Sequence, residues 1–302
     1  MAGTGVDRTR EAAEHGRICA LAVGCERDLR ACAEAHPDLF SGAPFDSALF
    51  TAVSMANAFG SPDAGRERLE VANRTSLWIF ALDWLIDYRA RSRPEVEQIL
   101  DWCRTAAVTP SAPDAAAGGP PLARLLGEIR DRLAVAPAFA AYRDVWLGEL
   151  HRMLDAMALE WEWKTAGKAN GQLTPSFEQY LGNADNFGST FVNVSHWLSG
   201  SSAAALARLD ELLEVSREVQ RVLRLLNDLA TYERDVTWGD LNALLLDVDR
   251  ATVQERIGEL VDRCETLLDP LRDDCPDETV YLGRQIGYSM GFYGAADYWG
   301  RL

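Results

Sequence analysis

The sequence predicts an all-α protein, built as a single helical bundle. Long segments carry apolar residues at three- and four-residue intervals, which is the period of helices that bury one face. Alternating runs of Val, Ile and Thr, which are typical of strands, are scarce. Short clusters of Pro, Gly and Ser separate the helical segments. We therefore expect a bundle of antiparallel helices.

The apolar period places ten helices along the chain, at residues 9–36, 47–59, 65–88, 93–106, 121–133, 137–168, 176–198, 203–233, 252–268 and 278–298. The third of these is almost wholly apolar between residues 76 and 86, so it is expected to be buried around most of its circumference. The clearest breaks are 109–121, which is rich in Pro, Ala and Gly, and 270–276.

The whole chain, 1–302, is interpreted as one domain. Its 302 residues, 48% of them hydrophobic, suffice for one large core. A domain boundary in the 109–121 break would separate two polar motifs, at residues 83–87 and 227–235, whose side chains need to share one cavity, as argued below. We therefore expect a loop there and no domain linker.

Charge and composition exclude several classes of protein. The net charge of −16 argues against a nucleic-acid partner, because phosphate backbones are bound by Lys and Arg. The first 20 residues lack a continuous apolar core, so they fit neither a signal peptide nor a membrane span, and a cytoplasmic protein is expected. The six cysteines show no CxxC spacing and the four histidines are scattered, which argues against zinc or redox chemistry.

The most informative motif lies between residues 227 and 235. A helix places Asn227, Thr231 and Asp235 on one face, where an amide oxygen, a hydroxyl and a carboxylate converge. These hard oxygen donors suit Mg²⁺, which shares its coordination shell with waters and substrate phosphates. The alternative is an ordinary solvated polar face.

A second acidic pair lies far upstream. Asp83 and Asp87 are one helical turn apart within the apolar segment, where two carboxylates need a cation, an Arg or a cavity to offset their loss of hydration. The alternative is an Asp pair at a helix end, bonded to Arg89, Arg91 or Arg93.

These motifs resemble those of bacterial class I terpene synthases. Such enzymes carry an acidic motif in the first third, a Ser-x-x-x-Tyr-Leu helix start in the middle, and Asn-Asp-x-x-Ser-x-x-x-Glu followed by Gly-Asp and Asn in the last third. Residues 83–87, 176–181 and 227–242 follow in that order here. The resemblance implies an α-helical bundle in which three Mg²⁺ ions hold a prenyl diphosphate, with Asp83, Asp87, Asn227, Thr231 and Asp235 as their ligands. Loss of the diphosphate would then leave an allylic carbocation.

The chain departs from this family pattern at three positions. Trp84 stands where a second adjacent Asp is usual, and Asp235 is one methylene shorter than the commoner Glu. Many relatives have an Arg that senses the diphosphate at the position of Ala184. The neighbouring Asn and Asp side chains do not provide its bidentate cationic fork.

Other cations are therefore expected to contact the diphosphate. Arg234, inside the third motif, and Arg301, near the chain end, are the first candidates. Arg221 and Arg224 are weaker ones, because we expect them to be solvated or paired on a helix face.

Aromatic rings on the helices near the motifs are expected to line the cavity, where ring faces can stabilise a carbocation. The principal candidates for substrate contact are Trp78, Phe80, Trp84, Phe187, Phe191 and Trp299, joined by Trp161, Trp163, Phe292 and Tyr293. For each single ring, ordinary core packing is the alternative.

The expected activity is Mg²⁺-dependent ionisation of a prenyl diphosphate to a diterpene hydrocarbon or alcohol. The substrate would be geranylgeranyl diphosphate or a copalyl-type diphosphate supplied by a separate class II cyclase. A sesquiterpene synthase acting on farnesyl diphosphate is the alternative, because hydrophobic pockets discriminate weakly per methylene. A chain-elongating prenyltransferase and a non-catalytic helical interaction protein are rival classes. Oligomeric state is left open, with a homodimer as one option.

Overall fold

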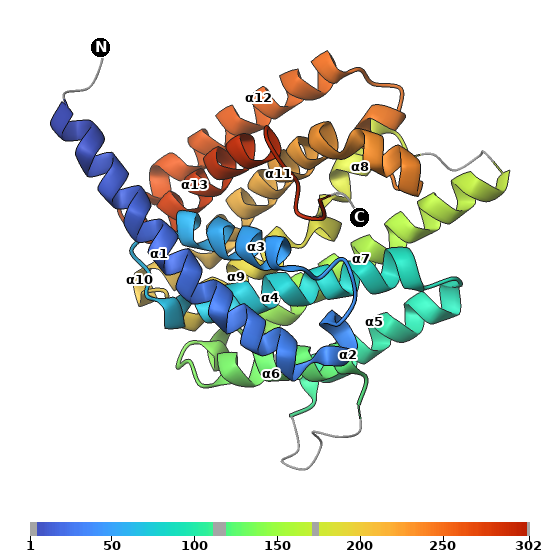
Figure 1. Cartoon of the computed structure of the whole chain (residues 1–302), viewed down its shortest axis with the longest axis horizontal. Helices are drawn as coiled ribbons and strands as arrows, with labels where there is room; N and C mark the ends of the chain where they lie inside the picture. The colour runs from blue at the N-terminus through green and yellow to red at the C-terminus, as the bar shows by residue number, and fades with distance from the viewer. Residues whose placement is uncertain (1–4, 111–118, 171–174, 301–302) are drawn as a thin grey trace.

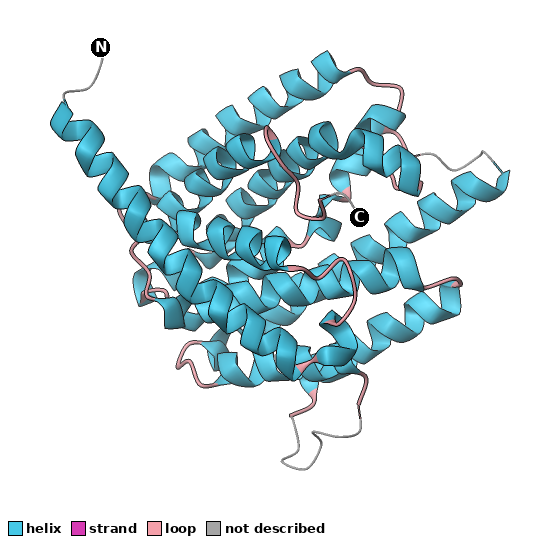
Figure 2. Cartoon of the chain, in the orientation of Figure 1, coloured by secondary structure: helices cyan, strands magenta, loops and turns pink. Residues whose placement is uncertain are grey.

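A computed structural model describes residues 5–110, 119–170 and 175–300. Every regular element in these ranges is helical, and none of their residues forms a strand (Figure 2). This confirms the all-α prediction. Among the same residues, no helix combines the length and the apolar character that crossing a membrane requires.

The α-helices are α1 (Gly5–Ala35), α2 (Pro37–Phe40), α3 (Ser47–Gly60), α4 (Arg66–Trp84), α5 (Arg93–Val108), α6 (Pro121–Ala134), α7 (Phe139–Asn170), α8 (Phe177–Gly182), α9 (Ser189–Gly200), α10 (Ala203–Leu206), α11 (Leu209–Trp238), α12 (Arg250–Leu268) and α13 (Pro276–Tyr293). Short elements join them, namely the π turn η1 (Leu85–Arg89) and the 3₁₀ turns η3 (Ala184–Phe187), η4 (Ala243–Leu245) and η5 (Asp269–Leu271).

Helix α4 runs through the interior of the bundle and carries one wall of the site (Figure 1). It packs against α1, α3, α6 and α9, and its Leu69, Leu77 and Leu82 are fully buried. This confirms that the apolar segment 76–86 is buried. On the other side of the site, α11 packs against α9, α12 and α13. Burial of the apolar faces of these helices is the main stabilising term in such a bundle.

We expected the helix to continue to Tyr88. Instead, α4 ends at Trp84 and is followed by the π turn η1. The turn is marked by the bond from the Ala90 amide to the Leu85 carbonyl, five residues apart, at 2.8 Å. Since a π turn widens the helix, it changes the direction of the side chains that follow. Asp87 and Tyr88 both belong to this turn.

The helix expected at 176–198 is interrupted. A capping box of Ser176 and Gln179 starts α8, which ends at Gly182, and α9 begins only at Ser189. Gly188, between them, has φ 78°, a left-handed conformation that favours glycine. Its neighbours leave no room either, because a Cβ there would lie 2.9 Å from Ile79 Cδ1. The apolar period alone did not reveal this break.

Two further boundaries differ from expectation. The segment 203–233 contains the short α10 and the long α11, and α11 continues to Trp238, where Gly239 ends it with φ 72°. The last helix stops at Tyr293 and not at 298, so Trp299 lies on a non-helical terminal segment. Tyr298 and Trp299 of this segment line the cavity described below.

Candidate active site

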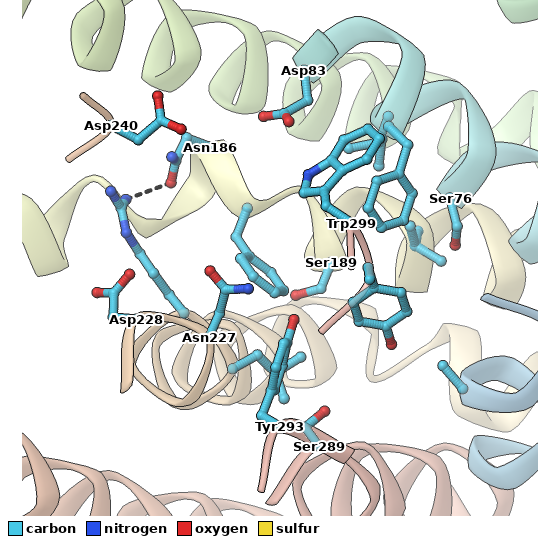
Figure 3. A pocket seen from close by; sticks show the side chains of 18 of the residues that line it. Ser76, Asp83, Asn186, Ser189, Asn227, Asp228, Asp240, Ser289, Tyr293 and Trp299 are labelled. Carbon is cyan, nitrogen blue, oxygen red and sulfur yellow. Dashed lines mark hydrogen bonds between the residues drawn. The ribbon is translucent and has the colours of Figure 1, made fainter. Parts of the chain in front are cut away.

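A cavity of about 250 Å³ lies inside the bundle. Its walls come from α3, α4, η1, α7, α8, η3, α9, α11 and α13, and from the loop after α11 and the terminal segment. Figure 3 shows Asp83 on one wall and Asn227 on the facing wall, with both side chains directed into the space between them. The structure therefore brings the two sequence motifs into one cavity.

One end of the cavity carries three carboxylates, Asp83, Asp87 and Asp240, which we call the acidic end. Burial raises the pKa of Asp83 well above its ordinary value, and the nearby Asp87 and Asp240 raise it further. Burial also raises the pKa of Asp87, to about 6, although the ammonium of Lys164 opposes the shift. Carboxylates in this setting are stabilised by a cation.

The partner of the acidic pair is a lysine of another helix. Lys164 Nζ lies 3.5 Å from Asp87 Oδ1. In the part of the chain that the structure describes, no ion pair joins Asp83 or Asp87 to Arg89, Arg91 or Arg93, and Arg93 instead pairs with Glu97 and Glu162 on the surface. The local arginine-bonded alternative is therefore wrong.

The facing wall belongs to α11. Asn227 and Asp235 line the cavity, whereas Thr231 does not reach it. Thr231 is 1% exposed, and its hydroxyl contacts Asp235 Oδ2 at 2.6 Å and the Asn227 carbonyl at 2.9 Å. Asn242 Nδ2 also donates to Asp235 Oδ2, at 2.8 Å. Because Thr231 and Asp235 are buried, this is not a solvated polar face.

The donor set of the two walls fits a hard divalent cation. Carboxylate oxygens from Asp83, Asp87 and Asp235 and an amide oxygen from Asn227 line the same cavity, and such oxygens are the ligands that Mg²⁺ prefers. Burial raises the pKa of Asp235 despite its bonds to Thr231 and Asn242. A bound cation would reverse the penalty that burial imposes on each charged carboxylate.

Arg234 also lines the cavity. Its guanidinium donates to Asp297 Oδ1 at 2.7 Å and to Asp235 Oδ1 at 3.3 Å, and lies 5.1 Å from the centre of the Trp238 ring. It therefore links α11 to the terminal segment. Arg301, the other first candidate, lies outside the described residues.

The expectation for Arg224 was wrong, because this residue is not solvated. It is 3% exposed and lines the cavity one turn before Asn227. Its guanidinium donates to the Asn183 carbonyl at 3.0 Å, to Glu160 Oε2 at 2.5 Å and to Asn186 Oδ1 (Figure 3). It also lies 3.7 Å from the centre of the Tyr180 ring. Arg221, by contrast, pairs with Glu218 at 2.6 Å, as expected.

Arg224 faces the segment where the expected sensor arginine is missing. Ala184 is buried in η3, next to the Asn183 and Asn186 groups that Arg224 contacts. The guanidinium of Arg224, from α11, thus lies in the region where an arginine at position 184 would be.

Asp228 is a buried cavity residue that the sequence analysis left out of the site. It accepts hydrogen bonds from the Tyr180 hydroxyl, at 3.0 Å to each carboxylate oxygen, and from the Ala243 amide at 3.2 Å. Burial raises its pKa to about 7, while Arg224 and these bonds oppose the shift. The adjacent Asn-Asp pair of the motif was the available signal, but only the fold shows that both residues reach the cavity.

The aromatic candidates divide into two groups. Phe80, Phe187 and Trp299 line the cavity, and Trp299 packs edge-on against Phe80 with ring centres 5.1 Å apart. Trp84, also proposed as a substrate contact, does not line the cavity and stacks on Tyr88 with ring centres 4.7 Å apart. Five further rings line the cavity, namely Tyr88, Tyr180, Tyr288, Tyr293 and Tyr298, and of these only Tyr293 was a candidate. Phe292, also a candidate, is not in the lining and packs against Tyr288 and Tyr298.

Trp78 and Phe191 do not line the cavity, contrary to their assignment as substrate contacts. Both are fully buried, with ring centres 6.0 Å apart, and the Trp78 indole donates to the Leu122 carbonyl at 3.0 Å. These two rings are therefore part of the packed core and not of the cavity wall. Trp161 and Trp163 also lie outside the cavity lining among the described residues.

Comparison with known proteins identifies the family. The family model for "Terpene synthase family 2, C-terminal metal binding" matches residues 74–269, which include both motifs. Ent-pimara-9(11),15-diene synthase of Streptomyces sp. (strain KO-3988) is 26% identical over 279 residues, covering 90% of each chain.

Solved structures agree on the fold. The chain matches 2-methylisoborneol synthase from Streptomyces coelicolor A3(2), in complex with Mg²⁺ and geranyl-S-thiolodiphosphate, with a TM-score of 0.70 at 17% identity over 90% of this chain and 91% of that one. Germacradien-4-ol synthase from Streptomyces citricolor matches with a TM-score of 0.68 at 13% identity, over 90% and 94%. Together with the family match, these findings show that the chain belongs to the bacterial class I terpene synthases, lyases that act on prenyl diphosphates.

Proposed function

We propose that this enzyme ionises a twenty-carbon prenyl diphosphate in a Mg²⁺-dependent reaction and converts it to a diterpene hydrocarbon or alcohol. The observation that carries the proposal is the arrangement of two oxygen-rich walls at one end of a cavity that aliphatic side chains and several aromatic rings also line. One end suits cations and diphosphate, and the other suits a hydrocarbon chain.

Asp83 and Asp87 on one wall, and Asn227, Thr231 and Asp235 on the other, are proposed to hold the metal, as three ions when diphosphate is bound. Mg²⁺ there would neutralise the charge that develops on the leaving oxygen. The mixed carboxylate and amide donors support this assignment. Thr231 can join the set once its hydroxyl exchanges its contact with Asp235 for a metal.

The aromatic rings that line the cavity are proposed to stabilise the carbocation. Phe80, Phe187 and Trp299 present ring faces or edges to the cavity and carry no strong nucleophile. Trp299 and the neighbouring Tyr298 belong to the terminal segment that covers the cavity, and this segment helps to exclude water.

The preference for a twenty-carbon substrate is supported by the sequence relative that makes ent-pimara-9(11),15-diene, a diterpene. A copalyl-type substrate supplied by a class II cyclase is included in this proposal. Farnesyl diphosphate is the alternative, because the structural match to germacradien-4-ol synthase shows that the same fold serves sesquiterpene chemistry.

The direct test is incubation of the purified protein with Mg²⁺ and, separately, geranyl, farnesyl, geranylgeranyl and copalyl diphosphates, followed by gas chromatography and mass spectrometry. We expect a Mg²⁺-dependent diterpene from geranylgeranyl or copalyl diphosphate. A sesquiterpene from farnesyl diphosphate alone would establish the alternative chain length. No product from any of the four, by protein with intact helical circular dichroism, would contradict the proposal.

Arg224 is proposed to take the place of the missing sensor arginine. It is the buried cavity cation beside η3, and its planar guanidinium can bind diphosphate oxygens through two N–H groups. Arg224→Lys keeps the charge but loses this fork, so we expect the rate to fall by about 10²-fold with the fold intact. Arg221→Lys, one turn earlier on α11 and outside the cavity lining, is the matched control. A wild-type rate for Arg224→Lys would remove Arg224 from the diphosphate site.

Domain organisation, oligomeric state and location complete the proposal. One domain over residues 1–302 is supported by a hydrophobic core whose buried residues run from α1 to α13. A homodimer and a cytoplasmic location stay predictions, and light scattering of the purified protein decides the first.

A further inference from the structure

Lys164 lies near the end of α7 with its ammonium inserted into the acidic end. Its side chain is 8% exposed. Nζ donates to Asp240 Oδ1 and, at 3.4 Å, to the backbone carbonyl of Asp87, and lies 3.5 Å from Asp87 Oδ1. One ammonium therefore contacts both the π turn that follows α4 and the loop that follows α11.

Tyr88 completes the arrangement. Its hydroxyl donates to Asp240 Oδ2 at 2.5 Å, and its ring lies 5.2 Å from Lys164 Nζ. Each Asp240 oxygen thus has a donor, one from Lys164 and one from Tyr88. The π turn η1 contains Asp87 and Tyr88 next to each other, so it carries both an ion-pair partner of Lys164 and the second donor to Asp240. Three chain segments distant in sequence are joined at this point.

The charges explain why a lysine is held there. Asp83, Asp87 and Asp240 line the same end of the cavity, with Glu160 also in the wall. Several partly buried carboxylates destabilise one another unless a cation lies between them. Lys164 forms ion pairs with two of the three carboxylates of the acidic end. An ammonium held beside Asp87 repels a divalent cation that approaches the same carboxylate, so the two cations compete there.

We propose that Lys164 is a positioning residue that acts as the counter-ion of the metal-free acidic end, tying Asp87 to Asp240, and that Mg²⁺ competes with it for this site. The inference rests on the proposed function, since it assumes that Asp83 and Asp87 bind Mg²⁺. Lys164 keeps the two carboxylates in place between turnovers and lowers the affinity of the empty enzyme for metal. Asp240 is the residue to which the ammonium remains attached when Asp87 turns to the metal.

The test is the Lys164→Met variant, which keeps the length of the side chain but removes its charge. Unfolding midpoints are measured in metal-free buffer and across a Mg²⁺ titration at a fixed concentration of inorganic diphosphate. Loss of the cation leaves the carboxylates unpaired, so the metal-free midpoint should fall by at least about 3 °C. The Mg²⁺ dissociation constant should fall by about tenfold, because the competing charge is gone. The gain in midpoint on saturation with Mg²⁺ should exceed that of wild type.

Two variants control the comparison. Arg93→Met also removes one positive charge, from a surface pair in which Arg93 Nη2 lies 3.1 Å from Glu162 on the same helix as Lys164, and should leave Mg²⁺ affinity unchanged. Lys164→Arg retains the cation and should keep the metal-free midpoint and Mg²⁺ affinity of wild type. If Lys164→Met does not fold without metal, Lys164→Gln supplies the same comparison.

Unchanged or weaker Mg²⁺ binding by Lys164→Met would overturn the inference while leaving the metal site of the proposed function intact. Failure of the wild-type protein to bind Mg²⁺ with diphosphate would overturn both. The two failures are thus distinguished by the wild-type titration alone.

Discussion

At the scale of single residues, the site is organised by buried charge. Asp83, Asp87 and Asp240 lie together with one ammonium, and Asp235 is held by Thr231 and Asn242. Each of these contacts satisfies a carboxylate in the metal-free protein. Cation binding is expected to alter the contacts of Asp87 and Asp235, whereas the ion pair of Lys164 with Asp240 is proposed to persist, so the residues can be tested separately by mutation.

The hydroxyl of Thr231 can be tested on its own. Thr231→Val has nearly the same shape but no oxygen, so if the hydroxyl is a ligand, the Mg²⁺ concentration for half-maximal rate should rise by about tenfold. The measurement is the initial rate against Mg²⁺ concentration. Thr231→Ser retains the oxygen and should behave like wild type. A wild-type Mg²⁺ dependence in Thr231→Val would mean that the hydroxyl only orients Asp235.

Asp228 predicts a pH dependence of stability. Its pKa is raised in the folded protein to about 7 by burial, above the unfolded value, so the folded state binds the extra proton at intermediate pH. The associated stability is fully present below the unfolded pKa and is lost as the pH rises through about 7, with a slope of at most about 1.4 kcal/mol per pH unit.

The comparison is between wild type and Asp228→Asn, by denaturant unfolding in EDTA from pH 4.5 to 7.5. The free energy of unfolding should fall with pH less steeply in the variant, because the titrating carboxyl is absent. Asp87, whose pKa is also raised, contributes to both curves and cancels. Parallel curves would show that Asp228 does not titrate in this range.

Some of these site residues could be predicted from the sequence and others could not. The spacing of Asn227 and Asp235 placed both on one face of a helix, and the structure has both in the cavity. Lys164 gave no signal, because it lies on a 32-residue helix and meets Asp240 across 76 positions of sequence. Arg224 was expected to be solvated or paired on a helix face, because only tertiary packing shows that its side of α11 is covered.

At the scale of elements, irregular turns between helices position several residues of the site. The π turn η1 contains Asp87 and Tyr88, and the interruption between α8 and α9 brings Phe187 and Ser189 to the cavity wall. Apolar periodicity predicted most helices because each buries one face, and α3, α5 and α6 start at or next to the expected residues. It could not predict the interruption at Gly188, because Leu181 and Ala184 before it and Phe191 after it are buried at spacings that a continuous helix would also show.

Gly188 provides the test at this scale. A Cβ would lie 2.9 Å from Ile79 Cδ1 and 3.0 Å from Met153 Sδ, and the left-handed backbone disfavours alanine as well. Gly188→Ala should therefore lower the free energy of unfolding by about 1–3 kcal/mol in denaturant titrations.

The matched control is Gly258→Ala in α12, where no atom lies within 4 Å of the added Cβ. This change should stabilise the helix by about 0.5–1 kcal/mol. Equal stability of Gly188→Ala and wild type would show that the turn tolerates a side chain and that its backbone is not fixed by glycine.

At the scale of the whole molecule, two helices separated by the long 109–121 break form the opposite walls of one cavity. Helix α4 brings Asp83 from the first third of the chain, and α11 brings Asn227 from the last third. The order of motifs in the sequence predicted this convergence through a family resemblance, and the family match over residues 74–269 confirms the resemblance. Which aromatic rings face the cavity required the structure, because Trp78 and Phe80 are two residues apart on α4 and only Phe80 lines it.

The most direct test of the central claim is the rate of inorganic diphosphate release from the preferred prenyl diphosphate, measured in Mg²⁺ and in EDTA. Asp83→Asn removes one charge from the acidic end, and Asp101→Asn, on the exposed face of α5, is its control. We predict Mg²⁺-dependent release by wild type and Asp101→Asn, and a loss of about 10³-fold or more in Asp83→Asn with helical circular dichroism unchanged. Release by Asp83→Asn at the wild-type rate, or release by wild type in EDTA, would contradict the assignment of this cavity as a metal-dependent ionisation site.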